Sequence, residues 1–320
     1  MIYYLIADHP APSWGTGMLY EHVRLLRGHG HEACVLHHHA PHWPSWRELE
    51  VPVQYLDQPG FAPTAADLVV VPEVLAASAA VRRHAWRRVV FVQGSFLIVS
   101  GMAGSVDYPA LGYEAAMAVL PHVARVVERH FGLPAEIVPP FIAPYFFDAD
   151  PRPRERRILL AVKEGYRLAG IPDEEIAGAL LQRETARRPG WSLVSLTDMT
   201  HREVAELMKS SLFLVNVNSL EAFNTTVPEA MAAGCVPICY EAIGGRDFLR
   251  DGENAIVFGN HEVYALVERV CELMDRLAEN EPLLARLRAA GRRTAAAFRP
   301  EVTAEALGDF FANQLRLAVR

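Results

Sequence analysis

NSLEAFNTTVPEAMAAGCVPICYEAIGG, residues Asn218 to Gly245, follows the short apolar run Phe213–Val217 and contains a second one, Val236–Cys239. Short runs of consecutive apolar residues are typical of parallel strands that are covered on both faces. Between the two runs, Pro228 suits the first turn of a helix and Gly234 suits its end. The stretch therefore predicts a strand, a loop, a helix and a second strand, the unit from which open α/β sheets are built.

The loop after the first of these strands is the candidate ligand site. Open α/β sheets bind ligands at the carboxyl ends of their strands, and the first N–H groups of a helix suit a phosphate. Two carboxylates, Glu221 and Glu229, flank the polar residues Asn224, Thr225 and Thr226. Thr226 and Glu229 also fit a capping box, in which both only satisfy backbone donors at the helix start. Glu221 is near no helix end, and a carboxylate beside a dry crevice needs a hydroxyl, a cation or water as partner.

Composition is that of a globular protein. The chain has 320 residues, 51% of them hydrophobic, which allows a large core and suggests two domains. A formal net charge of -7 provides no positive field, so nucleic acid is not an expected partner. The 4 cysteines are too few for a disulfide framework and are expected to be reduced core thiols: Cys34, Cys235, Cys239 and Cys271.

Neither a leader peptide nor a membrane span is expected. Asp8 interrupts the N-terminal apolar run too early for a signal peptide. The longest apolar run, Val89–Met102, contains Gln93 and is shorter than the ~20 residues that a membrane span needs. We therefore expect a cytoplasmic protein with, at most, peripheral contact with the inner face of a membrane.

The first half alternates strand and helix patterns. The β-rich run Ile2–Ala7 is followed by a loop with Gly15, Thr16 and Gly17, and then by a helix pattern from Met18. Further strands are expected at Ala33–Leu36, Val53–Leu56, Leu68–Val71 and Val89–Val92, and a helix pattern surrounds Tyr113–Phe131. This alternation predicts a doubly wound parallel sheet, with Gln93 at the end of a strand on the ligand-binding edge.

The glycine pair at residues 15 and 17 is a weaker indication of function. Gly15-x-Gly17 lacks the third glycine of a dinucleotide fingerprint, so a nicotinamide-dependent dehydrogenase is the least favoured function. What the two glycines support is a close approach of a ligand or a neighbouring loop to the backbone.

Two clusters of side chains carry weaker functional interpretations. Consecutive residues at a strand end point in opposite directions, so a metal site is not favoured for His37, His38, His39 and His42. A solvated helix face is favoured over contact with anionic lipid or an acidic acceptor for Arg82, Arg83, His84, Arg87 and Arg88, with Trp86 among them.

The second half repeats the α/β pattern after a proline-rich boundary near Pro144–Pro153. A strand at Ile158–Val162 leads into Lys163 and Arg167, a cationic pair that could meet a diphosphate or could be ordinary surface residues. Later, Thr200-x-x-Glu203 fits a capping box that opens a helix. The last helix pattern, Glu301–Val319, has apolar residues at helical spacing and should pack against the protein.

Together these residues resemble a known family. Glu221 to Pro237, EAFNTTVPEAMAAGCVP, followed by Gly244-Gly245 and by DGEN at Asp251–Asn254, resembles the E-x7-E signature of retaining glycosyltransferases of the GT-B fold, family four in particular. The resemblance implies two Rossmann-like domains facing a cleft, at 1–146 and 147–300, with a helix at 301–320 crossing back to the first domain. It also implies a nucleoside-diphosphate sugar as donor, with neither a metal ion nor a further cofactor.

The resemblance also implies roles for individual residues. Glu229 would hold the ribose hydroxyls, and Glu221 would lie by the donor sugar. The leaving diphosphate would be stabilised by Lys163 and Arg167, while Gln93 would lie on the acceptor side. Donor contacts would also come from Gly15, Thr16, Gly17, Phe223, Asn224, Thr225 and Thr226.

The chain departs from the family pattern at a few positions. The family usually has glycines where this chain has Ala222 and Asn224, an Arg-then-Lys order where it has Lys163 and Arg167, and often a histidine where it has Gln93. Asparagine tolerates the left-handed conformation better than most residues. The departures keep open the alternative of a catalytically impaired protein that binds nucleotides or glycans. A nucleotide-sugar epimerase on the same fold is a further alternative, but the extra acid/base groups that it needs are not evident in the sequence. The acceptor could be a glycan, a lipid-linked glycan or a small molecule.

Overall fold

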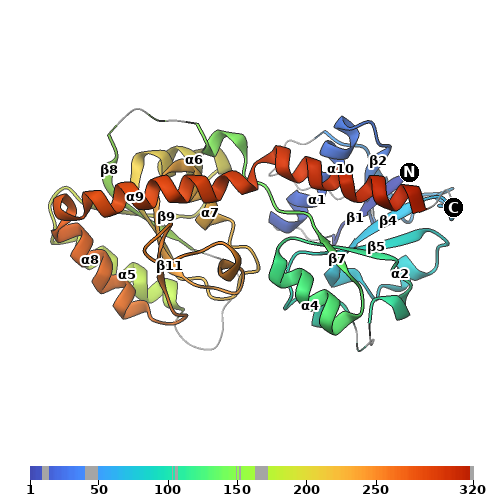
Figure 1. The fold of residues 1–320 in the computed structure, drawn as a ribbon, viewed down its shortest axis with the longest axis horizontal. Helices are drawn as coiled ribbons and strands as arrows, with labels where there is room; N and C mark the ends of the chain where they lie inside the picture. The colour runs from blue at the N-terminus through green and yellow to red at the C-terminus, as the bar shows by residue number, and fades with distance from the viewer. Residues whose placement is uncertain are drawn as a thin grey trace. The chain divides into compact units, whose positions relative to one another are not determined.

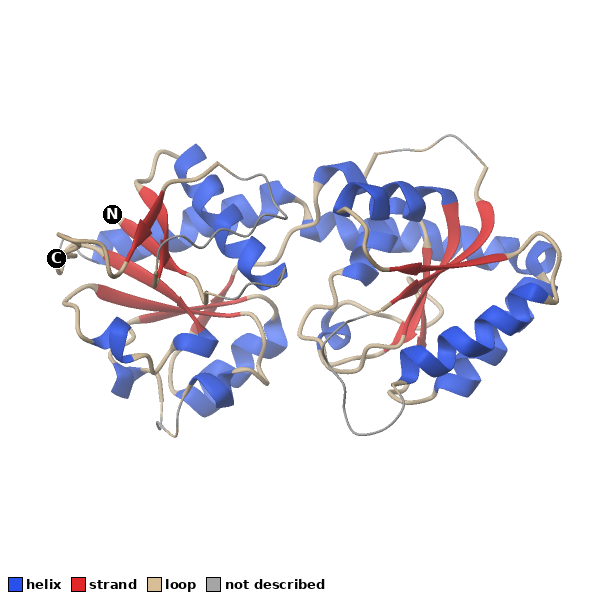
Figure 2. Cartoon of the chain, turned by 180° about the vertical axis from the view of Figure 1, so that it is seen from behind, coloured by secondary structure: helices blue, strands red, loops and turns tan. Residues whose placement is uncertain are grey.

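The computed structural model describes residues 1–8, 14–39, 50–102, 104, 107–148, 150, 153–162 and 172–317. The chain divides into two compact units, which are unit 1 (residues 1–140 with 301–320) and unit 2 (residues 141–300). Lys163, Arg167 and His42 lie outside the described residues. Both units are parallel sheets with helices packed on both sides, as Figure 2 shows.

Unit 1 contains a seven-stranded parallel sheet in the order β3-β2-β1-β4-β5-β6-β7. Its central strands are fully buried and apolar, as strands covered on both faces must be. The strands are β1 (Ile2–Leu5), β2 (Ala33–His37), β3 (Val53–Tyr55), β4 (Leu68–Pro72), β5 (Arg87–Val92), β6 (Ala115–Ala118) and β7 (Ala135–Ile137).

The helices of unit 1 come from both ends of the chain (Figure 1). They are α1 (Trp14–Gly28), η1 (Glu73–Leu75), α2 (Ala79–Arg82), α3 (Ile98–Gly101), η2 (Pro109–Leu111), α4 (Pro121–Phe131) and α10 (Pro300–Leu317). The side chains of Leu307, Phe310 and Phe311 on α10 are buried, and the Phe311 ring lies 6.5 Å from that of Tyr4. The hydroxyl of Thr303 donates a hydrogen bond to the Pro139 carbonyl at 2.9 Å. These contacts fix α10 to unit 1.

Unit 2 contains a five-stranded parallel sheet in the order β12-β11-β10-β8-β9. The strands are β8 (Glu155–Ala161), β9 (Ser192–Leu196), β10 (Ser211–Asn216), β11 (Val236–Tyr240) and β12 (Ile256–Phe258). The helices are η3 (Pro144–Phe146), α5 (Asp173–Ala186), α6 (His201–Ser210), α7 (Thr226–Ala233), η4 (Gly244–Asp247), α8 (Val263–Asp275), α9 (Leu277–Ala295) and η5 (Ala296–Phe298). The core joins apolar side chains of β8, β10 and β11 to those of α5 and α8.

Each sheet has one point where the strand order reverses. In unit 1 it lies between β1 and β4, and in unit 2 between β8 and β10. Because adjacent connections run to opposite faces there, the carboxyl ends of these strands flank a crevice that suits a ligand. The segments that reach these points are those after β1, β4, β8 and β10, so the quoted stretch after β10 begins at the switch point of unit 2.

Three details of the expected secondary structure are wrong. Helix α1 already begins at Trp14, so Gly15, Thr16 and Gly17 form its first turn and not a glycine loop. The expected helix over Tyr113–Phe131 contains strand β6, because burial between β5 and β7 outweighs the helix propensity of its alanines. The third detail concerns the basic cluster around Trp86.

That cluster is not a solvated helix face. Helix α2 ends at Arg82, and Arg87 and Arg88 begin strand β5. The Trp86 ring is 3% exposed and donates a hydrogen bond from Nε1 to the Val81 carbonyl at 2.9 Å. Arg88 is turned to main-chain carbonyls, including that of Leu111 at 3.2 Å. The aromatic ring in the middle of the cluster is core, whereas its neighbour Arg87 pairs with Glu114 at 2.8 Å.

Candidate active site

The loop after β10 is held by a pair of asparagines. The side-chain amide of Asn216 donates to Oδ1 of Asn224 at 2.9 Å, and Oδ1 of Asn216 accepts from the backbone N–H of Asn218 at 3.0 Å. Asn224 is buried and has φ of 55°, in the left-handed region, which asparagine enters more easily than most residues. Among the described residues, Ala222 is not one of those with a positive φ. Asn224 thus adopts a conformation that glycine would also suit, and its side chain adds a bond that glycine lacks.

Gly244 packs closely against the main chain of this loop. A Cβ on Gly244 would lie 1.6 Å from the Ala222 carbonyl oxygen. The Gly244 N–H donates a hydrogen bond to the Glu221 carbonyl at 2.9 Å. The side chain of Phe223 is 5% exposed and belongs to an aromatic cluster with Phe298, whose ring centre lies 4.8 Å away. The main chain of Glu221 and Phe223 is therefore fixed from both sides, while the Glu221 side chain is partly exposed.

Glu229 does not act as a helix cap. The N-cap position of α7 is Thr225, with no side-chain hydrogen bond to the backbone, so the capping-box interpretation of Thr226 and Glu229 is wrong. The Glu229 carboxylate is 4% exposed, and its Oε1 lies 2.7 Å from Nε2 of His201. A buried carboxylate needs a strong donor, and His201 satisfies it better than a backbone N–H does. Gly234 ends α7 with φ of 75°, as predicted.

His201 is positioned by its own helix. It is the first residue of α6, where Thr200 and Glu203 form the predicted capping box: Thr200 accepts from the Glu203 N–H at 3.3 Å, and Glu203 accepts from the Thr200 N–H at 2.8 Å. Both α6 and α7 begin on the edge of the sheet where the strands end, so their first turns lie on the same side as the loop after β10.

In unit 1, Gln93 lies at the end of β5 and faces helix α1. Its Oε1 is buried and has no hydrogen-bond partner among the described residues. A Cβ on Gly15 would lie 2.9 Å from that atom, so Gly15 leaves the room that the Gln93 amide occupies. This is a close approach of the kind expected for the two glycines, made here by a side chain of the same unit.

Glu73, which directly follows β4 at the switch point of unit 1, was not predicted as a site residue. Its side chain is 2% exposed and accepts a hydrogen bond from the Gly94 N–H at 2.7 Å. Burial raises the pKa of Glu73 to about 7. The local sequence VVVPEVL offers no signal for this, because an acid after a strand is most often a surface residue.

The histidine run is divided among different partners. His37 is buried, with Nε2 at 2.6 Å from the Tyr20 hydroxyl and Nδ1 at 2.6 Å from Asp8 Oδ1. His39 faces Asp57 at 2.9 Å instead. Within the described ranges, no group of three or more potential metal ligands comes together. The two ring nitrogens of His37 are engaged in ordering the segment after β1.

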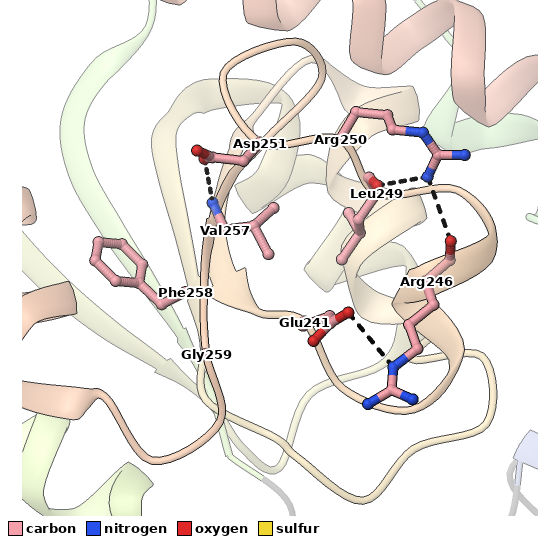
Figure 3. Close-up of a pocket in the computed structure, with 8 residues that line it drawn as sticks. All are labelled: Glu241, Arg246, Leu249, Arg250, Asp251, Val257, Phe258 and Gly259. Atoms are coloured by element: carbon pink, nitrogen blue, oxygen red, sulfur yellow. Dashed lines mark hydrogen bonds and ion pairs between the residues drawn. The ribbon is translucent and has the colours of Figure 1, made fainter.

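A separate pocket of about 490 Å³ lies beyond the carboxyl ends of β11 and β12 (Figure 3). It is shaped by an ion pair between Arg246 Nε and Glu241 at 3.4 Å and by Arg250, which donates to the Leu249 carbonyl at 2.7 Å. Asp251 accepts from the Val257 N–H at 2.9 Å and so ties the pocket wall to β12. This pocket lies at the outer strands, and the residues expected to bind the donor do not line it.

Comparison with known proteins supports the fold. Residues 194–294 match the family model of glycosyl transferases group 1. The chain is similar to a glycosyltransferase from Rickettsia africae, with a TM-score of 0.69, 11% identity and coverage of 98% of this chain and 97% of that one. It is also similar to HepE from Anabaena in complex with UDP, with a TM-score of 0.71, 12% identity and coverage of 98% and 99%.

A third structure matches over a smaller part. The pneumococcal O-GlcNAc transferase GtfA, in complex with UDP and GlcNAc, has a TM-score of 0.58 and 14% identity, with 80% of this chain and 58% of that one covered. No match is found among curated proteins. The two parallel-sheet units have the GT-B glycosyltransferase fold, which confirms the fold class predicted from the sequence. In the described residues, no helix combines the length and the apolar character needed to cross a bilayer.

Proposed function

We propose that this protein is a glycosyltransferase that moves a sugar from a nucleoside-diphosphate sugar to an acceptor, with retention of anomeric configuration and without a metal ion. The observation that carries the proposal is the loop and helix Glu221–Glu229 at the switch point of unit 2, inside the part that matches glycosyl transferases group 1. It is supported by the similar HepE structures, which contain UDP or UDP-glucose.

In this proposal the donor lies along the first turn of α7. The first N–H groups of a helix have no partner within the helix, and the helix dipole favours a negative charge there. The diphosphate would be bound by the N–H groups of Thr225 and Thr226, and the ribose hydroxyls by the buried carboxylate of Glu229. Glu221, fixed by Gly244 through its carbonyl, would receive a hydroxyl of the donor sugar.

The chemical step breaks the bond between the sugar and the diphosphate and forms a bond between the sugar and the acceptor oxygen, whose proton passes to the leaving diphosphate. Negative charge grows on the leaving diphosphate, and Lys163 and Arg167 would stabilise it in place of a metal ion. Roles for Gln93 and for Gly15, Thr16 and Gly17 stay predictions that the resemblance implies. The acceptor class, a glycan, a lipid-linked glycan or a small molecule, and the cytoplasmic location also stay proposals.

The geometry favours an active enzyme over an impaired one. The departure most suggestive of lost activity is Asn224, yet it has φ of 55° and is bonded to Asn216. Position 222 does not require a glycine, because Ala222 is not one of the described residues with a positive φ. The left-handed position of the loop, Asn224, is therefore occupied without a glycine.

A binding screen followed by a transfer assay tests the proposal. We expect one of UDP, GDP, ADP or TDP, or a sugar derived from it, to raise the melting temperature of the whole chain, because a ligand that binds the folded state stabilises it. With that donor, the parent should release nucleoside diphosphate in an acceptor-dependent or slow hydrolytic reaction.

The matched variant is Glu221→Gln. It should keep nucleotide binding and lose transfer by about a hundredfold or more, because its charge acts on the sugar and not on the nucleotide. Absence of binding to every nucleotide, or a folded Glu221→Gln variant as active as the parent, would refute the corresponding part of the proposal.

A further inference from the structure

Three side chains from three separate elements form one hydrogen-bonded row in unit 2. The Tyr145 hydroxyl of η3 lies 2.6 Å from Nδ1 of His201, at the start of α6. Nε2 of the same ring lies 2.7 Å from Oε1 of Glu229, in the first turn of α7. The three residues are 56 and 28 positions apart in the sequence, so only the fold brings them together.

The chemistry of these groups gives the row one direction. An ionised carboxylate can only accept hydrogen bonds, so Nε2 of His201 must carry the proton that it shares with Glu229. In the neutral ring Nδ1 is then an acceptor, and the Tyr145 hydroxyl is the donor that fits it. The row therefore runs from Tyr145 through His201 to Glu229 and selects one tautomer of the ring.

The imidazole is packed against aromatic rings as well as bonded at its two nitrogens. The Phe146 ring lies 4.9 Å from it and the Tyr145 ring 5.7 Å, the latter edge-on. The guanidinium of Arg202 lies 4.6 Å above the Tyr145 ring and so covers the far end of the row. Together with the capping box of α6, these contacts leave His201 little freedom to turn away from Glu229.

Only one of the two oxygens of the buried Glu229 carboxylate is bonded to His201. His201 bonds Oε1 of Glu229, and within the described ranges no hydrogen bond reaches Oε2. A carboxylate fixed through one oxygen presents the other at a set angle, which suits the hydroxyls of a ribose better than a carboxylate that rotates.

We propose that His201, supported by Tyr145, is a positioning residue that orients the Glu229 carboxylate for the ribose hydroxyls of the donor nucleotide. This inference rests on the proposed function, because it requires a nucleotide at α7. It predicts that His201 acts only on the part of the affinity that comes from the ribose hydroxyls, and leaves the contribution of the base and the diphosphate unchanged.

The test is a thermodynamic cycle between the protein and the ligand. Calorimetry measures the affinity of the full chain for UDP, GDP and ADP and for their 2′,3′-dideoxy counterparts. For the nucleotide that binds, the parent should prefer the ribose form by about tenfold or more. In His201→Ala this preference should fall to about threefold or less, while the affinity for the dideoxy form changes little.

Two further variants separate positioning from a structural role. His201→Gln keeps a donor that can reach Glu229 and should restore much of the preference, whereas Tyr145→Phe should lower it partway. Lys209→Gln removes the ion pair with Glu206 in the last turn of α6, away from His201, and should leave the preference as it is in the parent.

The outcomes are distinct. An unchanged ribose preference in His201→Ala overturns this inference alone. Equal losses in His201→Ala and Lys209→Gln also overturn it, because the effect would then be loosening of α6. If the parent binds neither these three nucleotides nor TDP, the proposed function fails first and this inference fails with it, whereas binding of TDP alone overturns this inference only.

Discussion

The close approach of Gly244 to the loop after β10 leads to a specific prediction for Gly244→Ala. The added Cβ would lie 1.6 Å from the Ala222 carbonyl oxygen, whereas real Cβ contacts below 3.0 Å are essentially never seen. The position of a Cβ is set by the main chain, and its partner is a main-chain oxygen, so no side-chain rotation can relieve the overlap. The two segments have to separate by about 1.4 Å, the difference between those distances.

That separation has two costs. Forcing an extra carbon into a packed site costs about 1–3 kcal/mol, and the bond from the Gly244 N–H to the Glu221 carbonyl, 2.9 Å long, is lost for about another 1 kcal/mol. We therefore expect unit 2 to lose about 2–4 kcal/mol of stability, a fall in melting temperature of about 6–12 °C for a unit of this size. Nucleotide affinity should fall more than tenfold, because the same shift displaces Glu221 and Asn224.

The neighbouring glycine provides the control. A Cβ on Gly245 would first meet Cδ1 of Leu249 at 2.6 Å, the end of a side chain that can turn aside. Gly245→Ala should therefore cost about 1 kcal/mol or less. Differential scanning fluorimetry and nucleotide titration on both variants provide the measurement. Equal melting temperatures for the two variants, with nucleotide affinity retained in Gly244→Ala, would refute the reasoning.

Three further changes test other parts of the structure. In the parent, the folded state keeps a proton on Glu73 between pH 4.5 and about 7 that the unfolded chain has lost, so stability should fall by roughly 3 kcal/mol as pH rises through that window. Glu73→Gln should remove this fall. The prediction is contradicted if the melting temperatures of parent and variant change equally from pH 5 to 8. Asn224→Val should cost about 2–4 kcal/mol in chemical denaturation, because it strains a residue at φ 55° and leaves the buried Asn216 amide without its partner, whereas Asn224→Gly should cost about half as much. Thr303→Val removes the bond to the Pro139 carbonyl and should destabilise unit 1 by about 1 kcal/mol, with nucleotide binding to unit 2 unchanged.

The sheets could be predicted because their strands are apolar at consecutive positions. Runs such as Leu68–Val71 and Phe213–Val217 have this pattern, and both are buried strands in the structure. Strand β6 escaped prediction because its sequence AAMA favours a helix when read alone, and only its place between β5 and β7 decides otherwise. Glycines at 15 and 17 similarly suggested a loop, although both lie in the first turn of α1, where Gly15 leaves room for the Gln93 amide.

The candidate site was predictable only where its signal is local. Asn224 could be expected to adopt a left-handed conformation from its residue type, and the Thr200–Glu203 capping box from its spacing. The same spacing rule failed at Glu229, because a histidine 28 positions away provides a stronger partner than the helix backbone. Glu73 could not be identified from the sequence, since its burial depends on the packing of the segments after β4 and β5.

The return of α10 to unit 1 also sets an order of assembly. Residues 141–300 form unit 2 from one continuous segment, whereas unit 1 needs both residues 1–140 and residues 301–320. During synthesis from the N-terminus, the first segment therefore waits with the surface around Tyr4 uncovered until Phe311 has left the ribosome. The second segment can complete its core while the first is still waiting. Unit 1, although begun first, is finished last, and its apolar surface around Tyr4 stays exposed until then.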